Sequence, residues 1–141
     1  MAAMKVRQVA HVCILARDLE ATRAFYRDVL GMETRFNFTR DGRIFGFYLD
    51  AGGRTNIEVF ENGASGFAES QNINHLCLEV ESLDEAVAHI RAAGVAVTDK
   101  HKGCDNTWQA WTADPDGVRI ELFEYTPESA QFTGGDREAD W

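Results

Sequence analysis

Hydrophobic and polar positions follow the same order twice along the chain, which predicts two copies of one module. An apolar, β-branched run at 8–16 predicts a strand. An apolar stripe at roughly helical spacing then predicts a helix over 18–30, with Asp18 as its N-cap and Gly31 after its end. Three further strands are expected at 32–38, 44–49 and 55–60.

The second half of the chain gives the same prediction, strand, helix and three strands. The opening strand is expected at 73–80, and Ser82 is expected to cap a helix over 83–94. Three strands complete this copy, at 95–98, 107–113 and 118–125. Between the copies, residues 61–72 are polar and rich in Gly, Ser and Asn, which is typical of a connector.

Matching residues at a nearly fixed offset support an internal duplication. His11-Val-Cys13 matches His75-Leu-Cys77 at an offset of 64, and Glu58 matches Glu121 at an offset of 63. We therefore expect one 141-residue domain made of a first module at about 5–62, a second at about 73–126, and a polar tail at 127–141. Thr126-Pro127 resembles a further helix start, and the rest of the tail is expected to be mobile.

Alternation along the strands places four chemically active side chains on the face opposite the aliphatic residues. These are His11, Glu58, His75 and Glu121. A single His or Glu on a strand is more often structural. Burying two carboxylates near each other is costly without a cation, so the set predicts a shared metal site.

Two other acidic residues do not fit this division of faces. Glu61 and Glu124 fall by parity on the aliphatic side, and we expect the strands to end or twist towards solvent there.

Charge and cysteine content remove several classes of function. A net charge of −9 argues against non-specific binding to nucleic acid or anionic lipid. Three cysteines without Cys-x-x-Cys spacing predict neither a disulfide framework nor a zinc ribbon. No apolar run approaches 18 residues and no leader pattern precedes the first strand, so a soluble cytoplasmic protein is expected.

The sequence resembles the vicinal oxygen chelate superfamily and, within it, most closely the glyoxalase I (lactoylglutathione lyase) group. The similar stretches are HVCILARDLEATRAFYRDVLGM, TNIEVFE, NHLCLEV and DPDGVRIELFE. The resemblance implies an α+β fold in which two βαβββ modules form a cup-shaped sheet of eight strands with helices outside. It also implies a homodimer with sites at the subunit interface.

The resemblance also implies the roles of the four residues. His11, Glu58, His75 and Glu121 match the metal ligands of the glyoxalase I group, with Glu121 as the first choice of catalytic base and Glu58 as its counterpart. One divalent ion is expected per site. These ligands suit Zn, Ni, Co, Mn or Fe, and the sequence does not choose among them.

The expected activity is that of a metal-dependent lyase or isomerase that acts on a small α-hydroxycarbonyl or a thiol hemithioacetal through an enediolate. Leu15 stands where the glyoxalase I group usually has an Arg that binds glutathione, so the thiol is open. Side chains expected to contact substrate are Asn62, Phe60, Trp108, Trp111 and Phe123.

Three alternatives stay open. An extradiol dioxygenase or an epimerase would use the same scaffold with a metal. A resistance protein of this superfamily would bind a small ligand or an antibiotic. The full set of four ligands favours the lyase over a metal-free binding protein.

Overall fold

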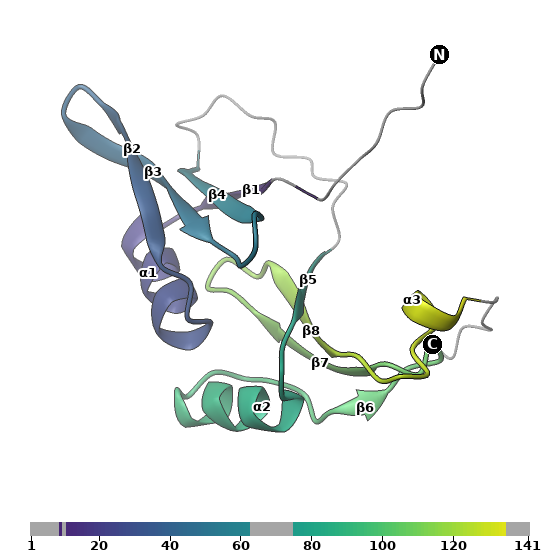
Figure 1. Cartoon of the computed structure of the whole chain (residues 1–141). Coiled ribbons are helices and arrows are strands. Elements are labelled where there is room, and N and C mark those ends of the chain that lie inside the picture. The colour runs from purple at the N-terminus through teal and green to yellow at the C-terminus, as the bar shows by residue number, and fades with distance from the viewer. Residues whose placement is uncertain (1–8, 10, 63–74, 135–141) are drawn as a thin grey trace, which may run out of the picture. The chain divides into compact units, whose positions relative to one another are not determined.

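The computed structural model describes residues 9, 11–62 and 75–134, and it divides the chain into two compact units, 1–69 and 70–141. Figure 1 shows the elements of each unit. The division falls within the predicted connector, most of which lies outside the described residues. Each unit is described by itself below.

Unit 1 contains one four-stranded mixed sheet in the order β1-β4-β3-β2. The first and last strands of the module, β1 (His11–Ala16) and β4 (Asn56–Glu61), pair in parallel. The other two, β2 (Thr34–Arg40) and β3 (Arg43–Asp50), form an antiparallel hairpin, and β3 also pairs with β4. The helix that follows β1 crosses to β2, which lies at the opposite edge of the sheet.

The crossover helix begins as predicted and changes its winding half-way. Asp18 caps α1 (Leu19–Ala24) by accepting the N–H of Ala21 at 3.0 Å. The chain then continues as a π-helix, η1 (Phe25–Val29), and Gly31 leaves it with φ of +71°.

The helix side of the sheet in unit 1 is closely packed with apolar side chains. Phe47, Leu49 and Val59 are fully buried there. Arg23 lies against this core with its guanidinium 4.2 Å from the centre of the Phe47 ring. Phe47 is therefore part of the core.

Unit 2 repeats the arrangement with a second four-stranded sheet, in the order β5-β8-β7-β6. Its parallel pair is β5 (His75–Glu79) with β8 (Arg119–Glu124), and β7 (Trp108–Ala113) pairs antiparallel with β8. The last strand, β6 (His101–Lys102), has only two residues.

The helix of unit 2, α2 (Leu83–Ala92), covers the aliphatic face of this sheet (Figure 1). Ser82 caps it by accepting the N–H of Glu85, as predicted. Buried Leu83, Ile90 and Leu122 belong to the core of this unit.

Glu124 has a structural role that the sequence did not reveal. Its side chain lies on the helix side of β8 and accepts the N–H of Leu83 at 2.7 Å. A carboxylate at this position satisfies a free N–H of the first helical turn and interacts favourably with the helix dipole. β8 ends at Glu124, as expected, but the side chain points to the helix and not to solvent. Its counterpart Glu61 pairs instead with Arg43 at 2.6 Å.

One predicted strand and one predicted helix start were also wrong. Residues 95–98 form no strand, although the N–H of Thr98 donates to the carbonyl of Trp111 and the hydroxyl of Thr112 donates to the carbonyl of Ala96. The final helix, α3 (Ala130–Thr133), begins after Ser129 and not after Thr126. The last residues of the tail, 135–141, lie outside the described part of the chain.

The first residues after β8 pack against the loop before β7 through buried hydroxyl groups. Thr107 and Ser129 are fully buried, and their hydroxyl oxygens lie 2.8 Å apart. The hydroxyl of Thr126 donates to the carbonyl of Asn106, which has φ of +61°. Gln131 and the N–H of Ala130 bind Asp105. Residues 131–133, which were expected to belong to a mobile tail, are instead part of α3, and Gln131 binds Asp105.

These observations confirm an α+β fold of two βαβββ modules, with the eight strands in two four-stranded sheets. No helix in the described residues is long and apolar enough to span a membrane.

A glycine in β3 should be essential for packing in unit 1. A Cβ at Gly46 would lie 2.5 Å from the carbonyl oxygen of Val59 and 2.6 Å from the Phe60 ring. We expect Gly46→Ala to lower the free energy of unfolding by about 1–3 kcal/mol, the usual cost of overpacking. Chemical denaturation measures this loss in the free energy of unfolding. Gly103→Ala is the control, because its Cβ would meet only side-chain ends of Gln109 and Asp105. Equal losses in both variants would refute this account.

The hydroxyl network should contribute more to stability than the exposed end of α3. Ser129→Ala leaves buried partners of its hydroxyl unsatisfied, so we expect a loss of about 1–3 kcal/mol in the free energy of unfolding. Thr133→Ala in the same helix should cost less, because Thr133 is exposed. Urea denaturation of both variants decides, and a larger loss for Thr133→Ala would contradict the assignment.

Candidate functional site

In unit 2, one imidazole and one carboxylate meet on the face of the sheet opposite α2. Nε2 of His75 on β5 lies 3.2 Å from Oε2 of Glu121 on β8. The parallel register pairs Cys77 with Glu121, which puts His75 diagonally across from the carboxylate on the same face. Glu121 is 7% exposed, so this carboxylate lies in a largely dry position.

The surroundings of Glu121 favour its protonated form. Burial raises the pKa of Glu121, the nearby His75 lowers it, and the charge of Asp105 raises it again. The thiol of Cys77 forms a hydrogen bond with Glu121. A buried carboxylate with a raised pKa is suited to accept and return a proton near neutral pH.

In unit 1 the equivalent residues lie on the equivalent face, with different partners. The register pairs Cys13 with Glu58, and the Cys13 thiol forms a hydrogen bond with this glutamate. Nδ1 of His11 lies 3.0 Å from the hydroxyl of Tyr48 on β3. Because Tyr48 occupies Nδ1, Nε2 is the nitrogen through which His11 could bind a cation.

Tyr48 is a residue that the sequence analysis missed. It pairs with Glu58 in the same way that Trp111 pairs with Glu121, at the duplication offset of 63. The ring centres are 5.8 Å apart for His11 and Tyr48 and 4.9 Å apart for His75 and Trp111. Extending the internal alignment from the glutamates to the neighbouring strands would have identified Tyr48.

The residues expected to contact substrate divide between the two faces. Phe60 shares a face with Glu58, and Trp111 and Phe123 share one with Glu121. Trp108 instead lies on the α2 side, where it pairs with Glu124 and its ring is 4.8 Å from the ammonium of Lys100. The structure therefore does not bring Trp108 together with the other residues of this group.

Two positions bear on recognition of the thiol. Leu15 lies on the same face of β1 as His11 and is half-buried. Asn62 is exposed directly after β4, and its backbone N–H donates to the carbonyl of Ala16 at 2.7 Å.

The donor atoms in unit 2 fit a divalent cation. Two ligands that are each about 2.1 Å from an ion lie about 3.0–3.4 Å apart at octahedral or tetrahedral angles. The separation of 3.2 Å between His75 and Glu121 falls in this range. Within the described residues, no group of three or more His, Cys, Asp or Glu side chains is gathered closely enough to hold a metal ion. The structure brings His75 and Glu121 together, and it places His11 and Glu58 on neighbouring strands of unit 1.

Comparisons with known proteins identify the family. The family model described as Glyoxalase/Bleomycin resistance protein/Dioxygenase superfamily matches residues 8–122. The chain belongs to this superfamily. Within it, the lactoylglutathione lyase of Salmonella typhimurium is 31% identical over 125 residues, which cover 83% of this chain and 92% of that protein.

Solved structures that share the fold differ in their described functions. A lactoylglutathione lyase from Agrobacterium tumefaciens matches with a TM-score of 0.69 at 23% identity, covering 86% of this chain and 96% of that one. TnmS3, an antibiotic-binding protein from Streptomyces sp. CB03234, matches with 0.68 at 21% identity, covering 88% and 100%. The resemblance inferred from the sequence is thus confirmed at the level of family and fold.

Each glutamate should control the reactivity of its own cysteine. Loss of water around the thiol and the charge of Glu58 raise the pKa of Cys13 to about 11, and burial with Glu121 raises the pKa of Cys77 to about 12. Cys77 is reached by solvent, but the hydrogen bond of its thiol to Glu121 also raises the thiol pKa. Removing that negative charge lowers the thiol pKa and increases the thiolate fraction at a fixed pH.

We therefore expect Glu121→Gln to speed alkylation of Cys77 several-fold and leave Cys13 unchanged, with the reverse for Glu58→Gln. Mass spectrometry of iodoacetamide adducts in chelator-treated protein measures the rates. Cys104 serves as the internal reference. If either variant altered both thiols alike, the two pairings would be wrong.

Proposed function

We propose that this protein is a metal-dependent lyase or isomerase of the glyoxalase type. Its substrate would be a small α-hydroxycarbonyl compound or the hemithioacetal of a 2-oxoaldehyde and a thiol. The observation that carries the proposal is the His75–Glu121 pair, with ligand atoms 3.2 Å apart on the face opposite α2. Family membership and a lactoylglutathione lyase at 31% identity support it.

In this proposal, His11, Glu58, His75 and Glu121 would hold one divalent ion, Zn, Ni, Co, Mn or Fe. The ion would supply Lewis-acid polarisation of a substrate carbonyl. Because each unit contributes one His and one Glu, the complete site needs both modules, from one chain or from the two subunits of a homodimer. The four residues lie on β1 and β4 of one sheet and on β5 and β8 of the other, so the site would depend on both sheets.

The protein's own groups would move the proton. Oε2 of Glu121 would take the proton from the carbon beside the carbonyl and return it to the neighbouring carbon. Burial raises the pKa of this carboxyl, which favours holding the proton between the two steps. The partly buried surroundings of His75 and Trp111 would limit access of water to the transferred proton.

The thiol portion of the substrate is expected to differ from glutathione. Leu15 offers an aliphatic side chain to the site face, and it cannot pair with a glutathione carboxylate as an Arg would. Assays of methylglyoxal with glutathione and with smaller uncharged thiols would rank the candidates.

A second candidate is a binding protein that takes up a small apolar molecule without chemistry. The aromatic side chains on the site face of unit 1, with Phe36 47% exposed, favour this alternative. Such a protein would need no divalent ion, so metal dependence separates the two candidates.

The decisive test compares two glutamates of the same strand. Glu121→Gln should lower metal content at least tenfold and abolish turnover of methylglyoxal hemithioacetals, because it removes a ligand and the base. Glu124→Gln is the matched control, since its side chain lies on the α2 side and an amide oxygen can still accept the N–H of Leu83. Elemental analysis and a product assay are the measurements. Protein that binds no divalent metal, or equal effects of the two substitutions, would disprove the lyase proposal.

A further inference from the structure

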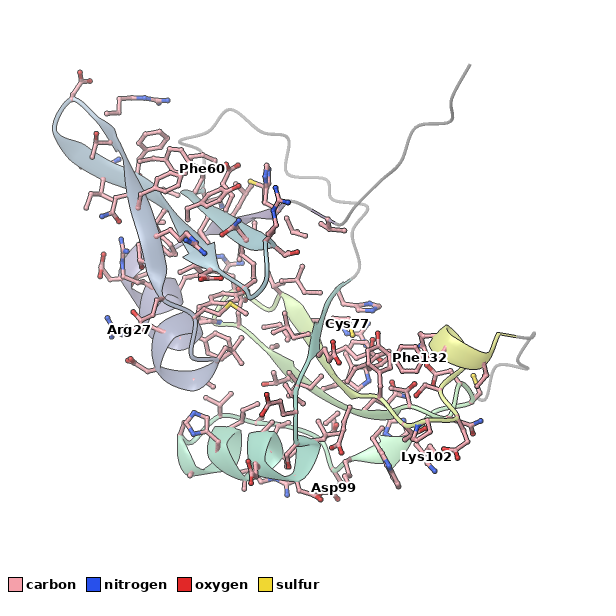
Figure 2. The ribbon with its side chains drawn as sticks, in the orientation of Figure 1. Arg27, Phe60, Cys77, Asp99, Lys102 and Phe132 are labelled. Atoms are coloured by element: carbon pink, nitrogen blue, oxygen red, sulfur yellow. The ribbon has the colours of Figure 1, made fainter. Side chains whose placement is uncertain are left out.

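Five aromatic rings form a continuous surface on the site face of unit 1. Phe36 stacks on Tyr48 with ring centres 4.8 Å apart, and Phe45 stacks on Phe60 at 5.4 Å. Phe38 joins the two pairs, with its ring centre 5.1 Å from Phe36 and 4.9 Å from Phe60. We call these five side chains the ring surface. Figure 2 shows Phe60 among its neighbours in this part of the sheet.

Backbone details specific to this module produce the ring surface. A register shift between β2 and β3 lies at Phe38 and Thr39, and Phe45 has no partner in the ladder there. Such a bulge redirects a side chain, which lets Phe45 reach Phe60 although strict alternation would put it with Phe47 in the core. Gly46 leaves the space that the Phe60 ring fills.

The described residues of unit 2 show a smaller group of rings, Phe123, Tyr125 and Phe132, and no counterpart of the five-ring surface on the outer strands. Its outer strand β6 has two residues, against seven in β2, and Gln109 stands at the position of Gly46. There the amide of Gln109 contacts Nε2 of His101 at 3.0 Å. The ring surface is therefore an addition to the duplicated plan and is not required by the fold.

The two ends of the ring surface differ in polarity. At one end, the Tyr48 hydroxyl contacts His11, and Tyr48 pairs across the sheet with Glu58. At the other end, the Arg40 guanidinium lies 4.4 Å from the centre of the Phe45 ring. Phe36 is 47% exposed and stacks on Tyr48, which leaves an accessible ring face near the nitrogen and oxygen atoms of His11 and Glu58.

We propose that the ring surface binds the planar aromatic body of a small neutral molecule whose oxygen atoms point towards His11 and Glu58. Flat rings gain from stacked and edge-on contacts beyond the simple burial of area. If the protein is the proposed enzyme, on which this step rests, the bound molecule is its substrate, an aryl-substituted carbonyl compound. As a binding site, it needs neither metal nor turnover.

A small molecule fits this surface better than another protein does. Phe36 is 47% exposed and the other four rings are half-buried, so the accessible area is that of a few partly covered side chains. A stable protein interface buries about 800 Å² on each partner, which is several times the area of one aromatic side chain.

The test titrates 2-naphthol into chelator-treated, full-length protein and follows the naphthol fluorescence. Saturable binding is expected, with decalin-2-ol, the saturated analogue, binding more weakly. Phe36→Leu keeps an apolar side chain and loses the ring, so it should weaken naphthol binding about 2- to 10-fold. Phe36→Tyr keeps the ring and should bind naphthol about as well as the unsubstituted protein does.

Phe132→Leu is the matched control, because Phe132 is a 65% exposed phenylalanine of unit 2 whose ring contacts Tyr125 and is not among the five rings of the ring surface (Figure 2). It should leave naphthol affinity unchanged. Absence of saturable binding, equal affinity for the saturated alcohol, or equal effects of the two Leu variants would overturn the proposal. So would a change of oligomeric state in Phe36→Leu with unchanged naphthol affinity, since the surface would then join two copies of the chain. Because the assay is free of metal, its result is separate from that of the metal and turnover measurements.

Discussion

Parallel pairing of the first and last strands of each module is the constraint on which the candidate chemistry depends. His11 and Glu58 are 47 positions apart, and His75 and Glu121 are 46 apart. They share one sheet face because β1 lies beside β4 and β5 lies beside β8, with a helix crossing on the other side. In unit 2 this register brings Nε2 of His75 to 3.2 Å from Oε2 of Glu121. A slip of one residue would turn Glu121 towards α2 and put Leu122 in its place.

The duplicated modules share this frame and have diverged around it. The cysteine that faces each glutamate is retained, while the residue next to the histidine is Tyr48 in one unit and Trp111 in the other. Unit 1 has the long β2–β3 hairpin with its ring surface. Unit 2 instead uses residues 126–133 to fix the loop that contains Asp105. Equivalent strands thus keep the His, Cys and Glu positions, and the outer strands and loops vary the surroundings.

The sequence predicts most of this arrangement, because alternation and end-capping are local. Asp18 and Ser82 cap their helices as expected, and the faces of His11, Glu58, His75 and Glu121 follow from parity. The errors arise where a distant partner decides. Glu124 resembles a surface residue until Leu83 is seen to donate to it. Residues 95–98 have strand-like composition, yet their polar groups bond irregularly to β7. The bulge that redirects Phe45 depends on the register with β2, which composition does not reveal.

The energetic asymmetry between the two glutamates has a chemical consequence. Glu121 is 7% exposed, with the charge of Asp105 acting on it, whereas Glu58 is half-buried beside Cys13. A carboxylate in the drier position gains most from an approaching cation, because little water is left to stabilise its charge. Burial also raises the pKa of Glu121, which favours its protonated form when no cation is near. These two properties together are what a group needs if it is to alternate between ligand and base. In the proposed lyase they favour Glu121 for that role, and Glu58 would hold the ion.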